Sequence, residues 1–238
     1  MHDKLKLPAA RRARLPKDAE PQVIIEWAVE RFGRQRMVAT SAFGMDGCAM
    51  LDMLSRRVEQ LDVIYVDTDF LFDETYALRD RLAARYPNLN FMRGHGGVSP
   101  EEQAAKHGEK LWESNPDLCC QIRKVDALAT MMNDVDVWFT SIRRTQSLTR
   151  AHTETVAWDW KYELTKICPL AKWTKEQVWA YVQANDVPFN PLHLQQYPSI
   201  GCTHCTRAVP GAEVTTESRA GRWQSSEKTE CGLHGDGI

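Results

Sequence analysis

Apolar and polar positions recur with helical and strand spacing along the first half of the chain. In "AEPQVIIEWAVERFG" the residues Ile24, Trp27 and Ala28 share one helical face and Gly33 is a stop signal, which predicts a helix. The next segments predict a strand in "MVATSAFG", a helix in "DGCAMLDMLSRR" and a buried, β-branched strand in "LDVIYVDTD". A helix that ends before Pro87 and a short strand in "NLNFMRG" follow.

The second half of the chain has a weaker pattern. Helical pieces are expected near residues 100–113 and from Leu118 to Met132, before another strand in "VDVWFTSI". "TVAWDWKYELTKICPL" indicates a hairpin or two short strands. "TKEQVWAYVQAND" predicts a helix with Thr174 as N-cap and Gln177 at the capping-box position. After Pro188 we expect irregular structure to the end of the chain.

The alternation of strands and helices through about residue 145 defines the expected fold class. It predicts an α/β fold with an open, mostly parallel sheet and helices on both faces. We expect one domain over residues 1–238, with 1–19 as a mobile arm and 200–238 as an irregular C-terminal tail. Ligands bind at the carboxyl ends of the strands in such sheets. Three loops follow strands there: "SAFGMDG", "DTDFLFDET" and "SIRRTQS".

Composition narrows the class of partner. The net charge of −2 and the pI of about 6.4 argue against a dedicated nucleic-acid binder, which would usually be basic. No apolar run approaches the roughly 20 residues of a membrane helix, and the polar start lacks the apolar stretch of a secretory signal. We therefore expect a cytoplasmic protein with reduced thiols, in which seven cysteines indicate metal binding or redox chemistry before disulfides.

Four of the cysteines form two close pairs, Cys119–Cys120 and Cys202–Cys205. A disulfide between Cys119 and Cys120 is disfavoured, because adjacent Cα atoms lie about 3.80 Å apart and disulfides need about 4.4–6.8 Å. Two pairs match the four-cysteine ligation of a [4Fe–4S] cluster, and a structural zinc ion stays open as the alternative. Cys48 and Cys168 lie in apolar surroundings and are expected in the core.

Basic residues gather in two places. Arg143, Arg144 and Arg150 follow a predicted strand, and Arg219 and Arg222 lie in the C-terminal segment. Guanidinium groups bind oxyanions bidentately, so a nearly neutral chain with local arginine clusters favours a small polyanion as ligand. "SAFGMDG" could add an anion site at a helix N-terminus, although a tight strand–helix turn explains it equally well.

The last cysteine is in "ECGLHGDGI", a Gly-rich segment in which permanent burial is not expected. A thiolate nucleophile on a mobile segment explains Cys231, because such a tail can close over a substrate and then present the sulfur to a partner. His234 and the arginine clusters would favour the thiolate. An incidental cysteine in a disordered terminus is the alternative.

These motifs together resemble one family, the assimilatory adenylyl-sulfate and phosphoadenylyl-sulfate reductases, from about Arg36 to His234. "TSAFGMDGCAML" resembles the family's Ser-x-Phe-Gly phosphate loop, and "VDTDFLFDETY" its Asp-Thr-Gly-x-Leu-Phe-x-Glu-Thr segment. "SIRRTQS", "KICPLAKWT" and "ECGLH" match its Arg-Arg loop, its Pro-Leu segment and its C-terminal signature. "CCQIRK", "GCTHC" and "RAGRW" are similar to the branch that carries a cluster and typically reduces adenylyl sulfate.

The resemblance implies an adenine nucleotide α-hydrolase-like domain that reduces adenylyl sulfate to sulfite and AMP, with thioredoxin as reductant, in assimilatory sulfate reduction and cysteine biosynthesis. Cys231 would attack the sulfur and carry an S-sulfocysteine intermediate. A [4Fe–4S] cluster would be held by Cys119, Cys120, Cys202 and Cys205. The expected substrate-binding residues are Ser41, Phe43, Gly44, Lys124, Arg143, Arg144, Arg150, Arg219, Arg222 and His234.

The chain departs from the family pattern at three positions. Asp69 replaces the usual Gly, Asp73 the usual Pro, and Cys168 a residue that is often Asn or polar. Asp69 would repel a polyanion unless it points away or meets a basic residue. Three alternatives stay open: use of the 3′-phosphorylated nucleotide, an ATP-pyrophosphate-cleaving ligase, and a redox or metal sensor. A homo-oligomer is compatible with the sequence but not indicated by it.

Overall fold

The fold is built around one six-stranded sheet. The computed structural model describes residues 15–16, 18–33, 35–224 and 226–234. The strand order is β3-β2-β1-β4-β6-β5, and every neighbouring pair is parallel except the antiparallel β5–β6 pair at one edge. The strands are β1 (Met37–Thr40), β2 (Leu61–Asp67), β3 (Leu89–His95), β4 (Val137–Phe139), β5 (Val156–Asp159) and β6 (Leu164–Ile167).

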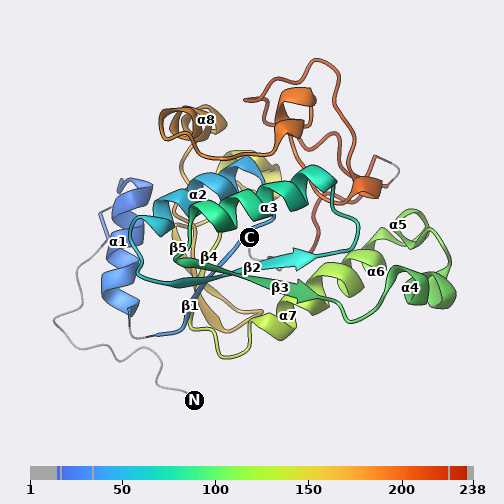
Figure 1. The fold of residues 1–238 in the computed structure, drawn as a ribbon, viewed down its shortest axis with the longest axis horizontal. Helices are drawn as coiled ribbons and strands as arrows, with labels where there is room; N and C mark the ends of the chain where they lie inside the picture. Colours follow the sequence, from blue (N-terminus) through green and yellow to red (C-terminus); the bar gives the residue numbers. More distant parts are fainter. Residues whose placement is uncertain (1–14, 17, 34, 225, 235–238) are drawn as a thin grey trace.

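Helices cover both faces of the sheet, as predicted (Figure 1). The larger core packs the sheet against α1 (Pro21–Phe32), α2 (Met45–Ser55), α3 (Asp73–Arg85) and α8 (Lys175–Ala184). The smaller core lies on the other face, under α7 (Asp126–Met131). Val38 and Ala39, adjacent in β1, belong to the two different cores, because successive side chains of a strand point to opposite faces.

The region between β3 and β4 is helical but broken. It contains α4 (Pro100–His107), α5 (Leu111–Ser114), α6 (Pro116–Cys120), a π-helical turn (Gln121–Val125) and α7. The helical pieces expected near 100–113 and 118–132 are confirmed, but the second is not a regular α-helix. Its wide turn places Arg123, Lys124 and Val125 in succession in buried positions.

One further expectation needs adjustment, and two others are confirmed. The strand expected in "VDVWFTSI" has only three residues. Thr140 N still donates to the Ile167 carbonyl at 2.9 Å, and the chain turns away from the sheet after this bond. The expected hairpin is confirmed as β5 and β6, and the capping box of Thr174 and Gln177 is present at the start of α8. Two 3₁₀ turns, Arg144–Gln146 and Leu148–Arg150, lie between β4 and β5.

The C-terminal segment is irregular, as expected. In the described part beyond Ala184 the structure contains only the 3₁₀ turns Pro191–Gln195 and Thr203–Cys205 and two isolated bridges, Leu71–Cys202 and Thr206–Arg222. In Figure 1 this segment lies near the end of the sheet toward which the arrows of β2 and β3 point. It therefore covers the carboxyl ends of the parallel strands.

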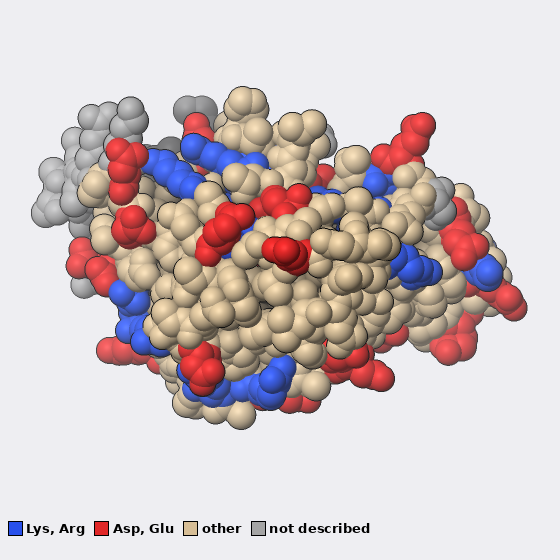
Figure 2. Space-filling model, turned by 90° about the horizontal axis from the view of Figure 1, so that it is seen from above, with Lys and Arg blue, Asp and Glu red and all other residues tan. Residues whose placement is uncertain are grey.

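The expected N-terminal arm lies mostly outside the described residues. Within it, Leu15 and Ala19 pack against the larger core. No helix of the described residues is long and apolar enough to cross a membrane. The face seen in Figure 2 carries acidic and basic side chains interspersed around a broad area of other residues, in keeping with the small net charge.

Candidate active site

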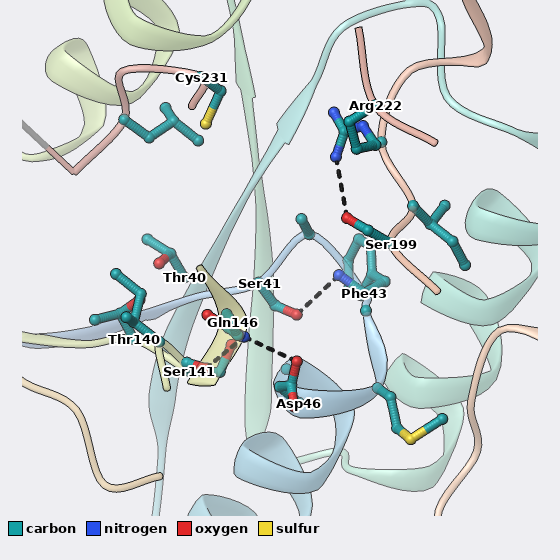
Figure 3. Close-up of a pocket in the computed structure, with 18 of the residues that line it drawn as sticks. Thr40, Ser41, Phe43, Asp46, Thr140, Ser141, Gln146, Ser199, Arg222 and Cys231 are labelled. Atoms are coloured by element: carbon teal, nitrogen blue, oxygen red, sulfur yellow. Dashed lines mark hydrogen bonds between the residues drawn. The ribbon is translucent and has the colours of Figure 1, made fainter. Parts of the chain in front are cut away.

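A cavity of about 230 Å³ opens between the carboxyl ends of the strands and the C-terminal segment. Thr40 at the end of β1, Thr68 after β2 and Thr140 after β4 line its floor. In the view of Figure 3, Cys231 and Arg222 from the C-terminal segment lie above the loop that carries Ser41. The expected site residues in the wall are Ser41, Phe43, Gly44, Lys124, Arg150, Arg219, Arg222, Cys231 and His234.

The loop between β1 and α2 has the geometry of an anion site. Phe43 adopts a positive φ of 57°, and its N–H donates to Ser41 Oγ at 3.0 Å. Gly44 is the N-cap of α2, so the free N–H groups and the positive end of the helix dipole face the cavity. A Cβ on Gly47 would meet Ser41 Oγ at 2.6 Å, so only glycine lets the helix approach the serine this closely.

Arg143 and Arg144 differ from the expectation, because neither side chain lines the cavity. Arg143 is completely buried, where its Nε donates to Asp46 Oδ1 at 2.6 Å and its Nη2 to Glu217 Oε2 at 2.7 Å. Arg144 Nε donates to the Thr153 carbonyl at 2.8 Å. Arg143 thus ties α2 to the C-terminal segment, and its charge is balanced by two carboxylates.

Arg150 and Arg219 line the cavity but already hold a protein carboxylate. Arg150 donates to Glu230 through Nε at 3.0 Å and Nη2 at 2.6 Å, and Arg219 Nη2 donates to the same carboxylate at 3.4 Å. Glu230 was not among the expected site residues. The sequence signals were its position directly before Cys231 and its place in the "ECGLH" signature, but a charged residue on a tail ordinarily predicts solvent exposure.

Three cations in the cavity wall have no carboxylate within ion-pair distance among the described residues: Lys124, Lys175 and Arg222. Burial lowers the pKa of Lys124, but the neighbouring thiols Cys202, Cys120 and Cys231 raise it by more. Lys175 Nζ donates only to carbonyl groups, those of Pro198 at 2.8 Å and Thr216 at 2.9 Å. A buried site with unbalanced positive charge favours an anionic ligand.

Lys175 was missed by sequence reasoning. It is the first residue of α8, where the helix dipole disfavours a cation and favours acidic side chains. Burial disfavours the charged form of Lys175 and so lowers its pKa. For the same reason, a charged lysine at this position is costly unless a ligand accepts its hydrogen bonds. The signal available in the sequence was a lysine at the first position of a predicted helix, where the helix dipole disfavours a cation.

The paired cysteines converge on a second, smaller cavity. Cys119, Cys120, Cys202 and Cys205 line it together with Lys124, which thus borders both cavities. Thr203 N donates to the Phe70 carbonyl at 2.8 Å, and Thr68 Oγ1 lies 3.3 Å from Cys202 Sγ, which fixes the second pair against the loop after β2. Burial first, and then the charges of the other three cysteines, raise the pKa of Cys119 to about 12.

The surroundings of these cysteines fit an iron–sulfur cluster. Arg123 is buried beside them, and its Nη2 has no hydrogen-bond partner among the described residues. A buried guanidinium N–H without an acceptor is costly, and the thiolate and sulfide sulfurs of a cluster would be acceptors. No three His, Cys, Asp or Glu side chains in the described part of the chain are arranged to hold one metal ion.

The tail that carries Cys231 is docked on the sheet. Lys161 Nζ donates to the Gly232 carbonyl at 2.8 Å, and Tyr162 OH to the Leu233 carbonyl at 3.3 Å. Gly232 has a φ of +79°, which turns the chain after Cys231. Cys231 itself is only partly buried, in the cavity wall.

His234 does not supply the positive charge that we expected near Cys231. It is partly buried, with Nδ1 shielded from solvent, and stacks on Trp138 with ring centres 5.1 Å apart. Burial first, and then the charges of Lys166 and Arg150, hold its pKa well below the usual range. His234 is therefore neutral in the docked tail, and the nearby charge comes from lysine and arginine.

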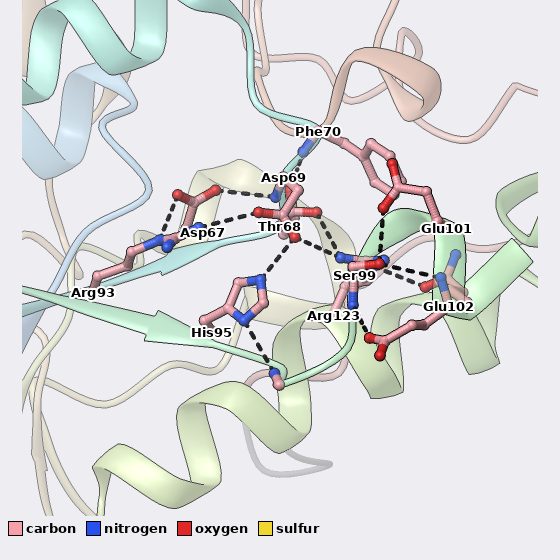
Figure 4. Close-up of polar contacts among 12 residues, drawn as sticks. Asp67, Thr68, Asp69, Phe70, Arg93, His95, Ser99, Glu101, Glu102 and Arg123 are labelled. Atoms are coloured by element: carbon pink, nitrogen blue, oxygen red, sulfur yellow. Dashed lines mark hydrogen bonds and ion pairs between the residues drawn. The ribbon is translucent and has the colours of Figure 1, made fainter.

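Asp69 meets basic residues, so the repulsion that its sequence position suggested is avoided (Figure 4). Its carboxylate contacts Arg93 at 3.1 Å, His95 at 2.7 Å and Arg123 at 2.7 Å. Asp69 has a φ of +59°, a conformation that glycine adopts without strain and that aspartate tolerates. Asp73 starts α3, where an acidic residue suits the helix dipole, and Cys168 lies in the core as expected.

Comparison with solved structures first defines the class. The fold resembles a phosphoadenylyl-sulfate reductase from Candida auris in complex with phosphate, with a TM-score of 0.69, 35% identity, and coverage of 81% of this chain and 91% of that one. It also resembles yeast FAD synthetase (TM-score 0.55, 12% identity, covering 80% of this chain and 66% of that one), which supports the fold alone. The chain has the adenine nucleotide α-hydrolase type of fold.

Sequence comparison identifies the family. Residues 36–208 match the phosphoadenosine phosphosulfate reductase domain. Proteins called adenosine 5′-phosphosulfate reductase are 45% identical in Shouchella clausii (89% of this chain, 86% of that protein) and 44% identical in Salinibacter ruber (90% and 83%). A Bacillus subtilis protein called adenosine 5′-phosphosulfate reductase 2 is 41% identical (89% and 88%). This chain belongs to the phosphoadenosine phosphosulfate reductase family.

Proposed function

We propose that this enzyme reduces adenylyl sulfate to sulfite and AMP with thioredoxin as the electron donor, as a step of assimilatory sulfate reduction that supplies cysteine biosynthesis. The observation that carries the proposal is the position of Cys231. Its thiol lies in the wall of a cavity whose cations Lys124, Lys175 and Arg222 lack carboxylate partners among the described residues. A nucleophile beside an anion site is what sulfur transfer from a phosphosulfate needs.

In the first step, the Cys231 thiolate attacks the sulfur of the mixed anhydride. A bond forms between Cys231 Sγ and that sulfur, and the bond from sulfur to the bridging oxygen breaks, so that AMP leaves with the electron pair. Cations in the cavity wall stabilise the charge that develops on the phosphate oxygen. The α2 N-terminus and the Ser41–Gly44 loop are suited to orient the nucleotide phosphate.

In the second step, a thioredoxin thiolate attacks Cys231 Sγ. The bond between the two sulfurs of the S-sulfocysteine breaks, and sulfite leaves with the electron pair. The resulting mixed disulfide is resolved by the second thioredoxin thiol, which restores the Cys231 thiolate. The two electrons for the reduction therefore come from the thioredoxin dithiol, which is oxidised to a disulfide.

We infer that the enzyme carries a [4Fe–4S] cluster on Cys119, Cys120, Cys202 and Cys205. The convergence of the two pairs on one cavity and the unpartnered Arg123 Nη2 support this assignment. When bound, the cluster supplies a fixed negative charge beside Lys124 and a rigid link between the two cysteine pairs. Lys124 holds its positive charge where it borders both cavities.

The nucleotide preference has a second candidate. The family description and the Candida auris structure name the 3′-phosphorylated substrate, whereas curated relatives at 41–45% identity carry the name of adenosine 5′-phosphosulfate reductase. We favour adenylyl sulfate because those relatives match most of the chain. A higher kcat/KM for the 3′-phosphorylated nucleotide would reverse this choice.

We place the reaction in the cytoplasm. All seven cysteines are free in the structure, which supports a reducing compartment where thioredoxin keeps thiols reduced. We propose a single domain over residues 1–238, which limited proteolysis tests, and a possible homo-oligomer, which a measurement of molecular mass in solution tests.

The decisive experiment separates the two steps. Protein purified without oxygen is mixed with adenylyl sulfate in the absence of thioredoxin, and AMP release and the mass of each cysteine peptide are measured. We expect one AMP per site and an added SO₃ group on the Cys231 peptide, which thioredoxin then removes as sulfite. Cys231→Ser should abolish both, whereas Cys168→Ala should not. An adduct on another cysteine would refute the assignment.

A further inference from the structure

The carboxylate of Glu230 is held by several donors directly beside Cys231. Its side chain is 15% exposed, and five donor atoms surround it. Arg150 donates twice, through Nε at 3.0 Å and Nη2 at 2.6 Å. Ser147 Oγ at 3.1 Å, Thr149 Oγ1 at 3.0 Å and Arg219 Nη2 at 3.4 Å complete the set.

These contacts are of a kind that stabilises a fixed position. Hydrogen bonds between ionised partners are roughly twice as strong as neutral ones, and partial burial reduces their screening by salt. Burial would raise the pKa of Glu230, but the hydrogen bond and charge of Arg150 and the charge of Arg219 lower it by more, so the carboxylate is ionised. The residues after Cys231 are held more weakly, by two single bonds to the carbonyls of Gly232 and Leu233. On the other side of Glu230, Arg219 donates to the Thr229 carbonyl and Lys228 pairs with Asp117.

The donors belong to two parts of the chain, the loop after β4 and the C-terminal segment 11 residues before Glu230. Thr149 and Arg150 belong to the 3₁₀ turn Leu148–Arg150 after β4, and Ser147 directly precedes that turn. Arg219 lies in the C-terminal segment, and its Nη2 also donates to the Thr229 carbonyl at 3.0 Å. Because Glu230 directly precedes Cys231, fixing its carboxylate fixes the thiol in the cavity wall.

We propose that Glu230 is a positioning residue that holds Cys231 in the substrate-facing position, and that this carboxylate must leave the Arg150–Arg219 site before a protein thiol can reach Cys231. The proposal rests on the proposed function of Cys231 as the nucleophile. A thioredoxin is far larger than the cavity, so its sulfur can meet the adduct only on an undocked tail. Glu230 then acts in opposite directions on the two steps: it favours sulfur transfer and opposes release.

The first test measures the position of the tail without any turnover. Iodoacetamide is added to the protein, and alkylation of the Cys231 peptide is followed by mass spectrometry. We expect Glu230→Gln to speed this alkylation about tenfold, because the ionic contacts are lost while the size is kept. Glu230→Asp should stay closer to the wild type. Glu227→Gln, the same change three residues earlier on an exposed side chain with no contact described above, is the matched control.

A milder variant and a salt series protect the test against misfolding. Thr149→Val removes one neutral donor outside the cavity and should speed alkylation two- to threefold. Raising the salt concentration should speed alkylation of the wild type only modestly, because the ionic contacts are partly buried, and should affect Glu230→Gln still less, because those contacts are lost. Equal rates for wild type, Glu230→Gln and Thr149→Val would overturn the proposal.

The second test measures the two steps separately by rapid quenching. In Glu230→Gln we expect adduct formation from adenylyl sulfate to slow about tenfold, while thioredoxin releases sulfite from the preformed adduct at least as fast as in the wild type. A variant that is merely destabilised would slow both steps. Equal slowing would therefore refute the positioning role. If the adduct forms on another cysteine but alkylation of Cys231 still responds to Glu230, the proposed nucleophile fails and the tail contact stands.

Discussion

The two sides of the cavity are held together by different kinds of interaction. On the sheet side, Thr40 ends β1 and Thr140 directly follows β4. Both strands pair in continuous register with their neighbours, so the positions of the two threonines depend on backbone hydrogen bonds. On the C-terminal side, Glu230 and Arg222 are fixed by side-chain contacts and by two isolated bridges. The backbone hydrogen bonds between paired strands break cooperatively, whereas one ion pair can break without the others.

This difference suggests a division of work. The sheet side is a preformed floor for the nucleotide, and the C-terminal side carries the groups that must change position during the reaction. Elements that move are drawn from the parts of a protein with few cooperative backbone contacts. Changes on the sheet side should therefore alter stability, and changes on the C-terminal side should alter cofactor content, rates and tail exposure.

The largest expected effect is the loss of the inferred cluster. Cys202→Ser removes one of four ligands and the sulfur that lies 3.3 Å from Thr68 Oγ1. We expect colourless protein without iron or inorganic sulfide, measured by chemical analysis after purification without oxygen. Cys168→Ala, which changes a buried cysteine outside the cavity, should keep its iron. Wild-type iron content in Cys202→Ser would contradict the assignment.

Among changes on the sheet side, replacement of Arg143 should lower the free energy of unfolding most. Arg143→Met leaves Asp46 and Glu217 without their buried partner, so we expect a loss of about 3 kcal/mol in the free energy of unfolding. Arg144→Met, one residue further, loses a bond to a single carbonyl and should cost about 1 kcal/mol. Denaturant unfolding at neutral pH measures both. Equal losses would show that the two carboxylates are not the reason.

The cation that borders both cavities should affect the reaction more than the fold. Lys124→Gln removes a positive charge close to the cavity thiols, and we expect kcat/KM for adenylyl sulfate to fall about 100-fold. Lys106→Gln, on an exposed face of α4, should have no effect. Iron content is measured alongside, so that loss of the cofactor is recognised. An unchanged kcat/KM at full iron content would exclude Lys124 from substrate binding.

Acid should release the tail in a way that depends on His234. Since the pKa of His234 is lowered in the docked tail, docking is fully favoured above about pH 6.5 and weakens as the pH falls below that value. The facing cations Lys166, Arg150, Lys161 and Arg219 all oppose its protonation. The ratio of Cys231 alkylation in wild type to that in His234→Phe should rise severalfold from pH 7.5 to 5.5. His152→Asn, on the surface, should leave the profile unchanged. A flat ratio would contradict this prediction.

The smallest expected effect is at Asp69. Asp69→Asn keeps a residue that tolerates positive φ but loses the ionic contacts with Arg93 and Arg123, and we expect a cost of about 1 kcal/mol. Asp69→Gly also relieves the backbone, so its Tm should not be lower than that of Asp69→Asn. Thermal unfolding measures both variants. A much lower Tm for Asp69→Gly would show that the side chain, and not the backbone, dominates at this position.

Much of the fold and part of the site could be predicted from the sequence. The sheet, the β5–β6 hairpin and the α8 capping box follow from local patterns, and the convergence of the cysteine pairs follows from their chemistry. Arg143 shows where local patterns fail. Its partners lie 97 and 74 residues away, so nothing near it in the chain indicates that its charge is already balanced.

The tail shows the opposite failure. A Gly-rich segment with a histidine predicted an open tail with a charged imidazole, whereas His234 is partly buried and neutral against Trp138. Docking depends on Lys161 and Tyr162, about 70 residues earlier, and on Trp138 in the sheet. Composition describes the freedom of the unfolded tail, but its folded position depends on distant partners.

The wide π turn between α6 and α7 has a geometric consequence. A regular α-helix advances about 100° per residue, and a π turn accommodates one surplus residue within a single loop of the spiral. Cys119 and Cys120 before the turn thereby face the small cavity, while Leu128 after it keeps its place against the sheet. If the same residues wound as a regular helix, one end would be out of phase with the other by about 100°. The π turn therefore accommodates one more residue in this helical stretch while the side chains before and after it keep their directions.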